Sequence, residues 1–250
     1  EIFHLFASVE QLATMLQAKN ETEHKTKEFL KSTISDISHQ LKTPLAALMM
    51  YQEIIEAEPD NTDTVKEFSQ KIGLALKRME QLILSMLKIT RLDTGNILFD
   101  KRACSVQELI KNAISELTTR ATQEKKQLIV QGTPNQTVIC DMDWTSEAIG
   151  NLVKNALDHT EAGGIIRITW ESTPTMLRIL VSDNGSGIAP EDIHHIFKRF
   201  YRSKYSLNIP GIGLGLPLAK SIIEGQGGLI SVQSVLHEGT TFSVSFLTKS

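Results

Sequence analysis

The sequence predicts two domains: an all-α antiparallel helical hairpin that forms a dimeric four-helix bundle, and then an α+β two-layer sandwich. Three observations predict this order. Apolar residues in positions 1–95 recur at alternating steps of three and four, as on one face of a helix. Thirteen of the fifteen glycines fall in residues 96–250, where apolar stretches alternate with polar helical ones. With 41% apolar and 22% charged residues, the 250-residue chain has an ordinary globular composition.

The composition excludes several classes of protein. A net charge of -3 gives no basic surface, so we expect no nucleic-acid partner. Cys104 and Cys140 form neither a metal-spaced cluster nor a disulfide framework, which fits a reducing compartment. No apolar run approaches the ~20 residues that cross a bilayer, so we expect no membrane contact within these residues. The sequence shows no signal peptide. Because the chain starts at Glu1 rather than at Met, we expect it to be a piece of a longer protein.

Three heptad-spaced stripes organise the helical half. The first, in residues 1–28, predicts a coiled-coil helix. Two more stripes in residues 29–95 flank a turn at 58–61, and two helices joined by so short a loop form an antiparallel hairpin. The positions of these two stripes are Leu30, Ile34, Ile37, Leu41, Pro44, Leu48, Tyr51 and Ile55, and then Val65, Phe68, Ile72, Ala75, Met79, Leu82, Met86 and Ile89.

Additional apolar positions widen both stripes beyond what one hairpin can bury. They are Leu45, Leu76, Ile83 and Leu87. A second copy of the hairpin would cover them, so we expect a homodimer with a four-helix core. The alternative is that the stripe packs against the second domain of the same chain.

Residues 96–250 read as a mixed sheet with helices. A capping box from Ser105 to Glu108 starts a helix that extends to about residue 126, and Asp143 is the expected N-cap of a helix over 144–159. A short helix is expected near Pro190 and another over 216–224. The expected strands cover residues 97–99, 128–130, 138–140, 165–170, 176–181, 229–235 and 241–246.

His39 is a candidate nucleophile. It falls between the stripe residues Ile37 and Leu41, and at ~100° per residue it points away from the stripe toward solvent. Pro44 removes a helical hydrogen bond one turn later and should bend the helix there. An exposed imidazole, with an ordinary pKa of about 6.5, is a competent nucleophile near neutral pH.

Polar residues on an otherwise apolar helix indicate a ligand. Glu147, Asn151, Asn155 and Asp158 form one stripe of the helix at 144–159. Two stacked asparagines need a polar partner, and a triphosphate with Mg²⁺ would supply one. Asp183 continues the inward parity of the strand before it, so its carboxylate should enter the same buried side and accept from a donor such as an adenine amino group.

Two glycine clusters complete the candidate pocket. Gly185 and Gly187 follow Asp183 and would let the backbone approach a flat ring. Gly211, Gly213 and Gly215 lead into a helix whose N-terminus suits phosphate. Their spacing is wrong for a dinucleotide fingerprint, and no strand precedes them.

Six segments, taken in order, resemble the motifs of two-component sensor histidine kinases. Residues 38–45 resemble the histidine motif, 91–95 the segment that closes the second helix, and 151–159, 183–187, 196–202 and 211–216 the four nucleotide motifs. The resemblance implies a dimerisation and phosphotransfer hairpin over 29–95 and a catalytic ATP-binding domain over 96–250. The implied fold of the latter is the sandwich shared with gyrase, mismatch-repair and chaperone ATPases.

The resemblance also implies the roles of individual residues. His39 would be phosphorylated, Asn155 would bind Mg²⁺, Asp183 would recognise adenine, and residues 203–210 would form a lid over ATP. The further nucleotide-binding residues it implies are Asn151, Asp158, His159, Gly185, Gly187, Ile188, Arg199, Tyr201, Arg202, Gly211, Gly213, Leu214, Gly215, Leu216 and Thr241.

One position departs from the family pattern. Gln40 follows the histidine where the family usually has an acidic residue, and an amide cannot hold a proton for general-base assistance. We therefore expect slow autophosphorylation. Thr43, one turn past His39, is a candidate for positioning water in phosphatase action. The implied partner is the receiver domain of a response regulator, and the implied location is the cytoplasmic region of a membrane-bound sensor.

Two other functions stay open at this point. A hydrolytic ATPase of the same superfamily would carry a glutamate four residues before the metal-binding asparagine, where this chain has Asn151. A non-enzymatic dimeric scaffold would lack phosphotransfer altogether. Only Gln40, in place of the usual acidic residue, supports this alternative.

Overall fold

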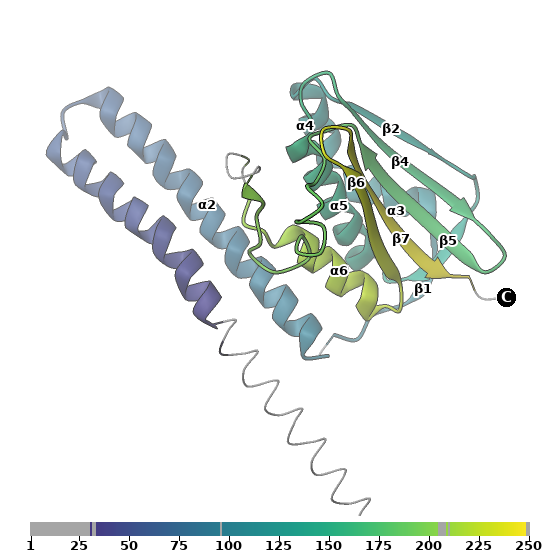
Figure 1. The fold of residues 1–250 in the computed structure, drawn as a ribbon. Coiled ribbons are helices and arrows are strands. Elements are labelled where there is room, and N and C mark those ends of the chain that lie inside the picture. Colours follow the sequence, from purple (N-terminus) through teal and green to yellow (C-terminus); the bar gives the residue numbers. More distant parts are fainter. Residues whose placement is uncertain (1–30, 32–33, 96, 205–208, 210, 249–250) are drawn as a thin grey trace, which may run out of the picture. The chain divides into compact units, whose positions relative to one another are not determined.

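The computed structural model describes residues 31, 34–95, 97–204, 209 and 211–248 (Figure 1). The chain divides into two compact units, residues 1–81 and 82–250. The expected coiled-coil helix over 1–28 lies outside the described residues. The domain limits drawn from the sequence stay predictions.

The first unit contains the expected hairpin helices. Residues 34–57 are helical, and α2 (Thr62–Asp93) begins after a short turn and continues into the second unit. The side chain of Asn61 caps α2, because its Oδ1 accepts from the amide of Thr64 at 3.2 Å. The rings of Tyr51 and Phe68 lie 5.6 Å apart between centroids, so the two predicted stripes contact each other.

A single chain leaves apolar side chains of both hairpin helices in solvent. Leu45 is 50% exposed and Leu76 is 53% exposed, and both are positions outside the two narrow stripes. Ile34, which the sequence placed in the first stripe, is also exposed. So much exposed apolar surface on facing helices is typical of a surface that another chain covers.

The second unit contains a five-stranded mixed sheet with the order β2-β4-β5-β7-β6. Only β2 and β4 are parallel, and the other neighbours are antiparallel. Alternate residues of the central strands are buried, which is the period-two pattern of a half-covered sheet. The strands are β2 (Gln127–Gly132), β4 (Ile165–Ser172), β5 (Met176–Asp183), β6 (Leu229–Val235) and β7 (Gly239–Leu247).

Helices cover one face of this sheet (Figure 1). The central helix is α5 (Met142–His159), which packs on α6 (Gly215–Gly225) and α3 (Val106–Ile114). Its apolar stripe, including Ile149, Leu152 and Val153, is fully buried. Burial of this stripe fixes the rotation of α5, and the rotation decides which polar side chains reach the pocket. A separate two-stranded sheet joins β1 (Arg102–Ser105) to β3 (Thr137–Cys140).

Four local predictions were wrong. The helix expected from residue 105 to 126 is interrupted after Ile114, and α4 (Leu117–Gln123) follows as a separate helix. Asp141, not Asp143, caps α5, because its carboxylate accepts from the amide of Trp144 at 3.2 Å. Residues after Pro190 form turns rather than a helix. Residues 97–99 are not a strand, since they pair with no other strand in the described chain.

The segment that follows α2 contacts the N-terminal end of α5 and the C-terminal end of α6. The ring of Phe99 lies edge-on to Trp144, with centroids 6.2 Å apart. The amide of Asp100 donates to Asp141 at 3.0 Å, and Nζ of Lys101 donates to the carbonyl of Gln226 at 2.7 Å. These contacts replace the strand pairing that the sequence suggested there.

Cys104 and Cys140 are both buried free thiols on the small sheet. Burial raises the pKa of the Cys140 thiol to about 12, which keeps it protonated and unreactive at neutral pH. Among the described helices, none combines the length and the apolarity that crossing a membrane requires.

Candidate functional site

Four elements of the second unit meet at one end of the sheet. The C-terminal end of α5 contacts the loop after β5, where the amide of Ser186 donates to the carbonyl of His159 at 3.0 Å. The N-terminus of α6 lies against the middle of α5, because a Cβ on Gly215 would lie 3.2 Å from Oδ1 of Asn151. The turn between β6 and β7 closes the fourth side, since the amide of His237 donates to the carbonyl of Ser186 at 2.8 Å.

The two carboxylate oxygens of Asp183 differ in their hydrogen bonds within the described residues. Its Oδ1 accepts from the amide of Gly185 at 2.9 Å and from the amide of Thr240 at 3.3 Å. Its Oδ2 accepts no hydrogen bond from any described residue. Burial raises the pKa of Asp183, and the two backbone donors partly oppose that shift. A half-buried acceptor that is oriented but not saturated is suited to bind a ligand donor.

Close backbone contacts shape the loop that follows. Gly187 has φ +65°, and a Cβ there would lie 2.0 Å from the carbonyl oxygen of Val235. Only glycine fits at that contact. The amide of Ile188 donates to Oγ of Ser234 at 2.8 Å, so the end of β6 also holds this loop.

The polar stripe of α5 separates into two parts. Nδ2 of Asn151 donates back to the carbonyl of Glu147 at 3.0 Å, while the half-buried amide of Asn155 has no hydrogen-bond partner in the described chain. Asp158, which the resemblance placed in the pocket, instead pairs with Arg120 of α4 at 2.6 Å. His159 remains at the loop, with Nδ1 3.4 Å from Oγ of Ser186, and burial lowers its pKa.

The N-terminus of α6 offers unoccupied amides. Leu214 is the N-cap residue and is buried, and no side chain caps this helix. Gly213 has φ +75° and turns the chain into the helix, with Leu216 in the first turn and Gly211 exposed before it. Uncapped first-turn amides attract an anion.

The segment between the two glycine clusters is held by polar contacts. The hydroxyl of Tyr201 donates to Asp192 at 2.5 Å, and the guanidinium of Arg202 donates to the carbonyl of Ile209 at 2.5 Å. Arg199 pairs with Asp93, the last residue of α2, which belongs to the same compact unit. Of the expected lid over 203–210, residues 205–208 and 210 lie outside the described residues.

Sequence reasoning missed Thr240 and chose its neighbour. Thr240 is buried beside Asp183, whereas Thr241 lies on the opposite side of β7, where its hydroxyl donates to Ser182 at 3.0 Å. Strict alternation from the inward Phe242 would have identified Thr240. Asp192 was also missed, because no periodicity marks a residue in a turn.

The residues expected at the phosphotransfer centre lie in the first unit. His39, Gln40 and Thr43 are all exposed on the helix over 34–57. The neighbouring Ser38 donates to the carbonyl of Ile34 at 2.8 Å, a contact within the helix. The imidazole of His39 is therefore accessible to a reagent from solvent.

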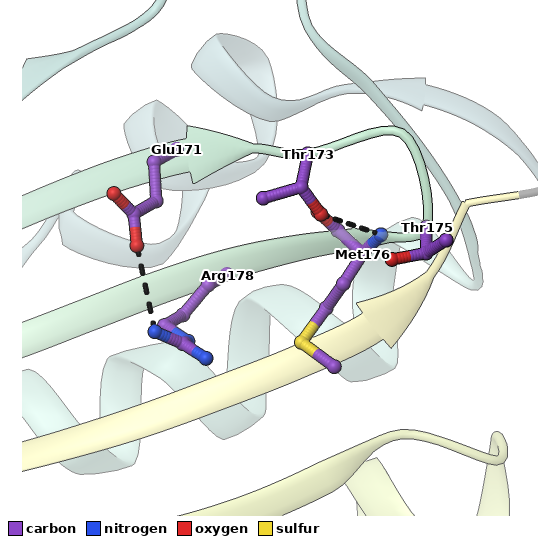
Figure 2. Close-up of a pocket in the computed structure, with 5 residues that line it drawn as sticks. All are labelled: Glu171, Thr173, Thr175, Met176 and Arg178. Carbon is purple, nitrogen blue, oxygen red and sulfur yellow. Dashed lines mark hydrogen bonds and ion pairs between the residues drawn. The ribbon is translucent and has the colours of Figure 1, made fainter.

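A separate small pocket lies at the turn between β4 and β5 (Figure 2). Its volume of about 200 Å³ is below the ~300–1,000 Å³ of ordinary ligand sites. Glu171 and Arg178, which line it, pair with each other at 3.5 Å. It lies at the start of β5, at the opposite end of that strand from Asp183, so it is not part of the site described above.

The residues present fit a Mg²⁺–nucleotide. A neutral amide oxygen such as that of Asn155 is a hard ligand suited to Mg²⁺, which usually keeps water and phosphate oxygens for its other positions. Among the described residues, no group of three His, Cys, Asp or Glu side chains lies together in a way that could hold a metal ion. The free Oδ2 of Asp183 and the amides of α6 suit a purine amino group and phosphates.

Two family models match the chain. The His Kinase A (phospho-acceptor) domain matches residues 12–95, and the histidine kinase-, DNA gyrase B- and HSP90-like ATPase matches residues 140–250. Curated relatives include the sensor-like histidine kinase SenX3 of Mycobacterium tuberculosis, 28% identical over 85% of this chain, and the sensor protein SrrB of Staphylococcus aureus, 30% identical over 89%. The chain spans 52% of SenX3 and 39% of SrrB.

Solved structures share the fold. A histidine kinase ThkA in complex with the response regulator protein TrrA has a TM-score of 0.75 at 22% identity, covering 92% of this chain and 66% of that one. The mycobacterial sensor histidine kinase MprB is 26% identical, with a TM-score of 0.53 over 59% of this chain and 97% of that one.

Fold and site thus define a helical phospho-acceptor hairpin followed by an ATPase-type nucleotide-binding sandwich. The chain belongs to the sensor histidine kinases of two-component systems, as its motifs predicted.

Proposed function

We propose that this chain is the catalytic part of an ATP-dependent protein-histidine kinase that phosphorylates His39. The observation that carries the proposal is that one chain contains both an exposed histidine, in the first unit, and Asp183, a half-buried carboxylate in the second unit with only one oxygen hydrogen-bonded by described residues. The second unit would bind ATP, with the adenine amino group at Asp183 and the phosphates near Asn155 and the N-terminus of α6. Mg²⁺ bound at Asn155 would offset the charge of the phosphates.

The chemistry is a phosphoryl transfer to nitrogen. An imidazole nitrogen of His39 attacks the γ-phosphorus, and the bond to the β,γ-bridging oxygen breaks, so that ADP leaves. The ring releases its N–H proton to solvent. In the second reaction an aspartate oxygen of a response regulator attacks the same phosphorus, the P–N bond breaks, and the ring takes up a proton from solvent to regenerate the neutral imidazole. The binding of a response regulator by ThkA, which shares this fold, is the precedent for such a partner.

A second copy of the chain completes the four-helix bundle. The exposed apolar side chains Leu45 and Leu76 support a dimeric four-helix bundle as the working form. We propose that these residues form the cytoplasmic region of a sensor protein that is bound to the membrane.

Labelled ATP tests the kinase. Incubation with γ-labelled ATP and Mg²⁺ should yield acid-labile, alkali-stable label on the protein, which His39→Gln abolishes. The matched control is His194→Gln, since His194 is another exposed histidine, and it should keep its label. Release of ADP and phosphate without labelled protein would favour a hydrolytic ATPase. If neither labelled protein nor released ADP and phosphate formed, the result would favour a non-enzymatic scaffold.

We also propose that the chain dephosphorylates its response regulator. Thr43 lies one turn after His39 on the same exposed helix, where its hydroxyl can position a water molecule. Thr43→Ala should reduce regulator dephosphorylation while sparing autophosphorylation. Full phosphatase activity in this variant would refute the role of Thr43.

A further inference from the structure

Asp192 is a buried carboxylate with no role in the reaction described so far. It is 6% exposed and lies in the turns that follow the Asp183 loop. Its own backbone is fixed, because its amide donates to the carbonyl of Ala189 at 2.9 Å and its carbonyl accepts from the amides of His195 and Ile196. These three hydrogen bonds fix the backbone from which the carboxylate extends.

Each oxygen of Asp192 holds a different hydroxyl. Oδ1 accepts from the phenol of Tyr201 at 2.5 Å, and Oδ2 accepts from the hydroxyl of Ser203. The ring of Tyr201 also packs on His195, with centroids 5.5 Å apart. The hydrogen bonds from Ser203 and then Tyr201 lower the pKa of Asp192, so the carboxylate is ionised at neutral pH and acts only as an acceptor.

Tyr201 and Ser203 begin the segment that returns to α6. The amide of Phe200, just before Tyr201, donates to the carbonyl of Gly213, just before α6, at 2.9 Å. A Cβ on Gly213 would lie 2.8 Å from the carbonyl oxygen of Tyr201, so the backbones at Tyr201 and Gly213 are in close contact. The direction of the chain at Tyr201–Ser203 therefore decides where Arg202 is held relative to the amides of α6.

We infer that Asp192 is a positioning residue for nucleotide binding, which fixes Tyr201 and Ser203 so that the segment after Phe200 is held in place beside the N-terminus of α6. This inference rests on the proposed ATP site. Asp192 touches neither the nucleotide nor His39. Its loss should weaken retention of ATP without altering the transfer step at saturating ATP.

Asp192→Asn is the test variant, because it keeps the shape but replaces one acceptor oxygen with a donor group. Each hydroxyl can rotate, but only one of them keeps an equivalent acceptor. The dissociation constant for a fluorescent ATP analogue should rise about tenfold, the size expected for one charge-assisted hydrogen bond. The KM for ATP should rise in parallel, with kcat within about twofold of the wild type.

A double-substitution cycle separates this role from a structural one. In the Tyr201→Phe/Ser203→Ala background, Asp192→Asn should add less than twofold, because its partners are already absent. Glu191→Gln is the matched control, because Glu191 is exposed and its ion pair with Lys204 is long, at 4.0 Å. The dissociation constant of this variant for the ATP analogue should change less than twofold. A full tenfold effect of Asp192→Asn in the double background would overturn the inference.

Limited trypsin cleavage provides a readout that needs no nucleotide. In the nucleotide-free protein, at a temperature well below the melting temperature of both variants, cleavage after Arg202 should be several-fold faster in Asp192→Asn than in Glu191→Gln. Unchanged cleavage would overturn the inference even if ATP binding weakened. If the wild type binds no nucleotide, the proposed function fails, whereas the trypsin result still reports whether Asp192 holds this segment.

Discussion

Thr240 donates its backbone amide to Oδ1 of Asp183 over 3.3 Å, although the two residues are 57 positions apart. The contact exists because β5 and β7 are antiparallel neighbours in which Asp183 lies directly opposite Thr240. Sheet register, rather than a local motif, therefore orients this carboxylate. The second oxygen, Oδ2, accepts no hydrogen bond from any residue that the structure describes.

Asp183→Asn should separate ligand binding from stability. The substituted amide can still accept from Gly185 and Thr240, but it places a donor where Oδ2 was, opposite a purine amino group. We expect a loss of about 2–3 kcal/mol in binding, or roughly 30- to 150-fold in the dissociation constant for ATP. Titration with a fluorescent nucleotide measures it, and binding within threefold of the wild type would contradict the assignment of Asp183.

Burial raises the pKa of Asp183, and the sign of that shift predicts how stability depends on pH. An acid whose pKa is raised on folding favours the folded state most below its unfolded pKa, and that contribution is lost as pH rises through the folded pKa. Asp183→Asn has no such group. It should match or exceed the wild type in melting temperature at pH 7, and the difference should shrink as pH falls toward 4.

Gly239→Ala should damage both the fold and the site. Gly239 has φ +127°, and a Cβ would lie 2.0 Å from the carbonyl oxygen of Asp183, so the β5–β7 register would have to shift. We expect about 3 kcal/mol or more of destabilisation, in the range of severe backbone clashes. The control is Gly163→Ala, which has φ +86° with no atom within 4 Å and should cost only ~1 kcal/mol. Urea unfolding compares the two, and equal losses would show that φ strain alone matters.

Much of the fold was predictable, because its elements follow periodicity. The strands around Ile168, Ile179 and Val244 alternate strictly, and α5 carries a continuous apolar stripe, so each element was located from its own residues. The order of strands in the sheet was not predictable, since pairing across β5 and β7 is a non-local choice. Asp141 replaced Asp143 as the cap because tertiary contacts, not the local sequence, decide where α5 begins.

The candidate site was predictable where a motif carries a mechanism and not elsewhere. Glycines at close contacts and paired asparagines identify themselves by residue type. The hydrogen bonds of Thr240 and Asp192 depend on sheet register and on turn geometry, which a sequence does not display. Asp158 lies on the same polar stripe of α5 as Asn155, yet its carboxylate forms an ion pair with Arg120, because a half-buried carboxylate favours a guanidinium within reach.

Asp158→Asn should therefore affect stability rather than nucleotide binding. Arg120 contacts both Asp158 and Glu124 at 2.6 Å, and these partners raise the pKa of the guanidinium against an opposing effect of burial. Removing one charge from a partly buried network should cost about 1 kcal/mol. Arg120→Gln should cost a similar amount, and the double variant should cost less than the sum. Nucleotide affinity should stay within twofold, and a tenfold loss would return Asp158 to the pocket.

Gln40→Glu should accelerate autophosphorylation. Gln40 and His39 are adjacent and exposed on one helix, so a carboxylate there can accept the imidazole proton as the N–P bond forms. General-base assistance is worth about 10²–10⁴-fold where geometry is ideal, and we expect tenfold or more. Initial rates of acid-labile labelling at saturating ATP measure the effect. Gln40→Asn is the matched control, because it keeps the amide and should give no gain. If Asp36, one turn earlier, already serves as the base, then Asp36→Asn should slow autophosphorylation, and adding Gln40→Glu to that variant should restore the rate.

A rate that is unchanged or lower in Gln40→Glu would show that Gln40 does not limit phosphorylation of His39.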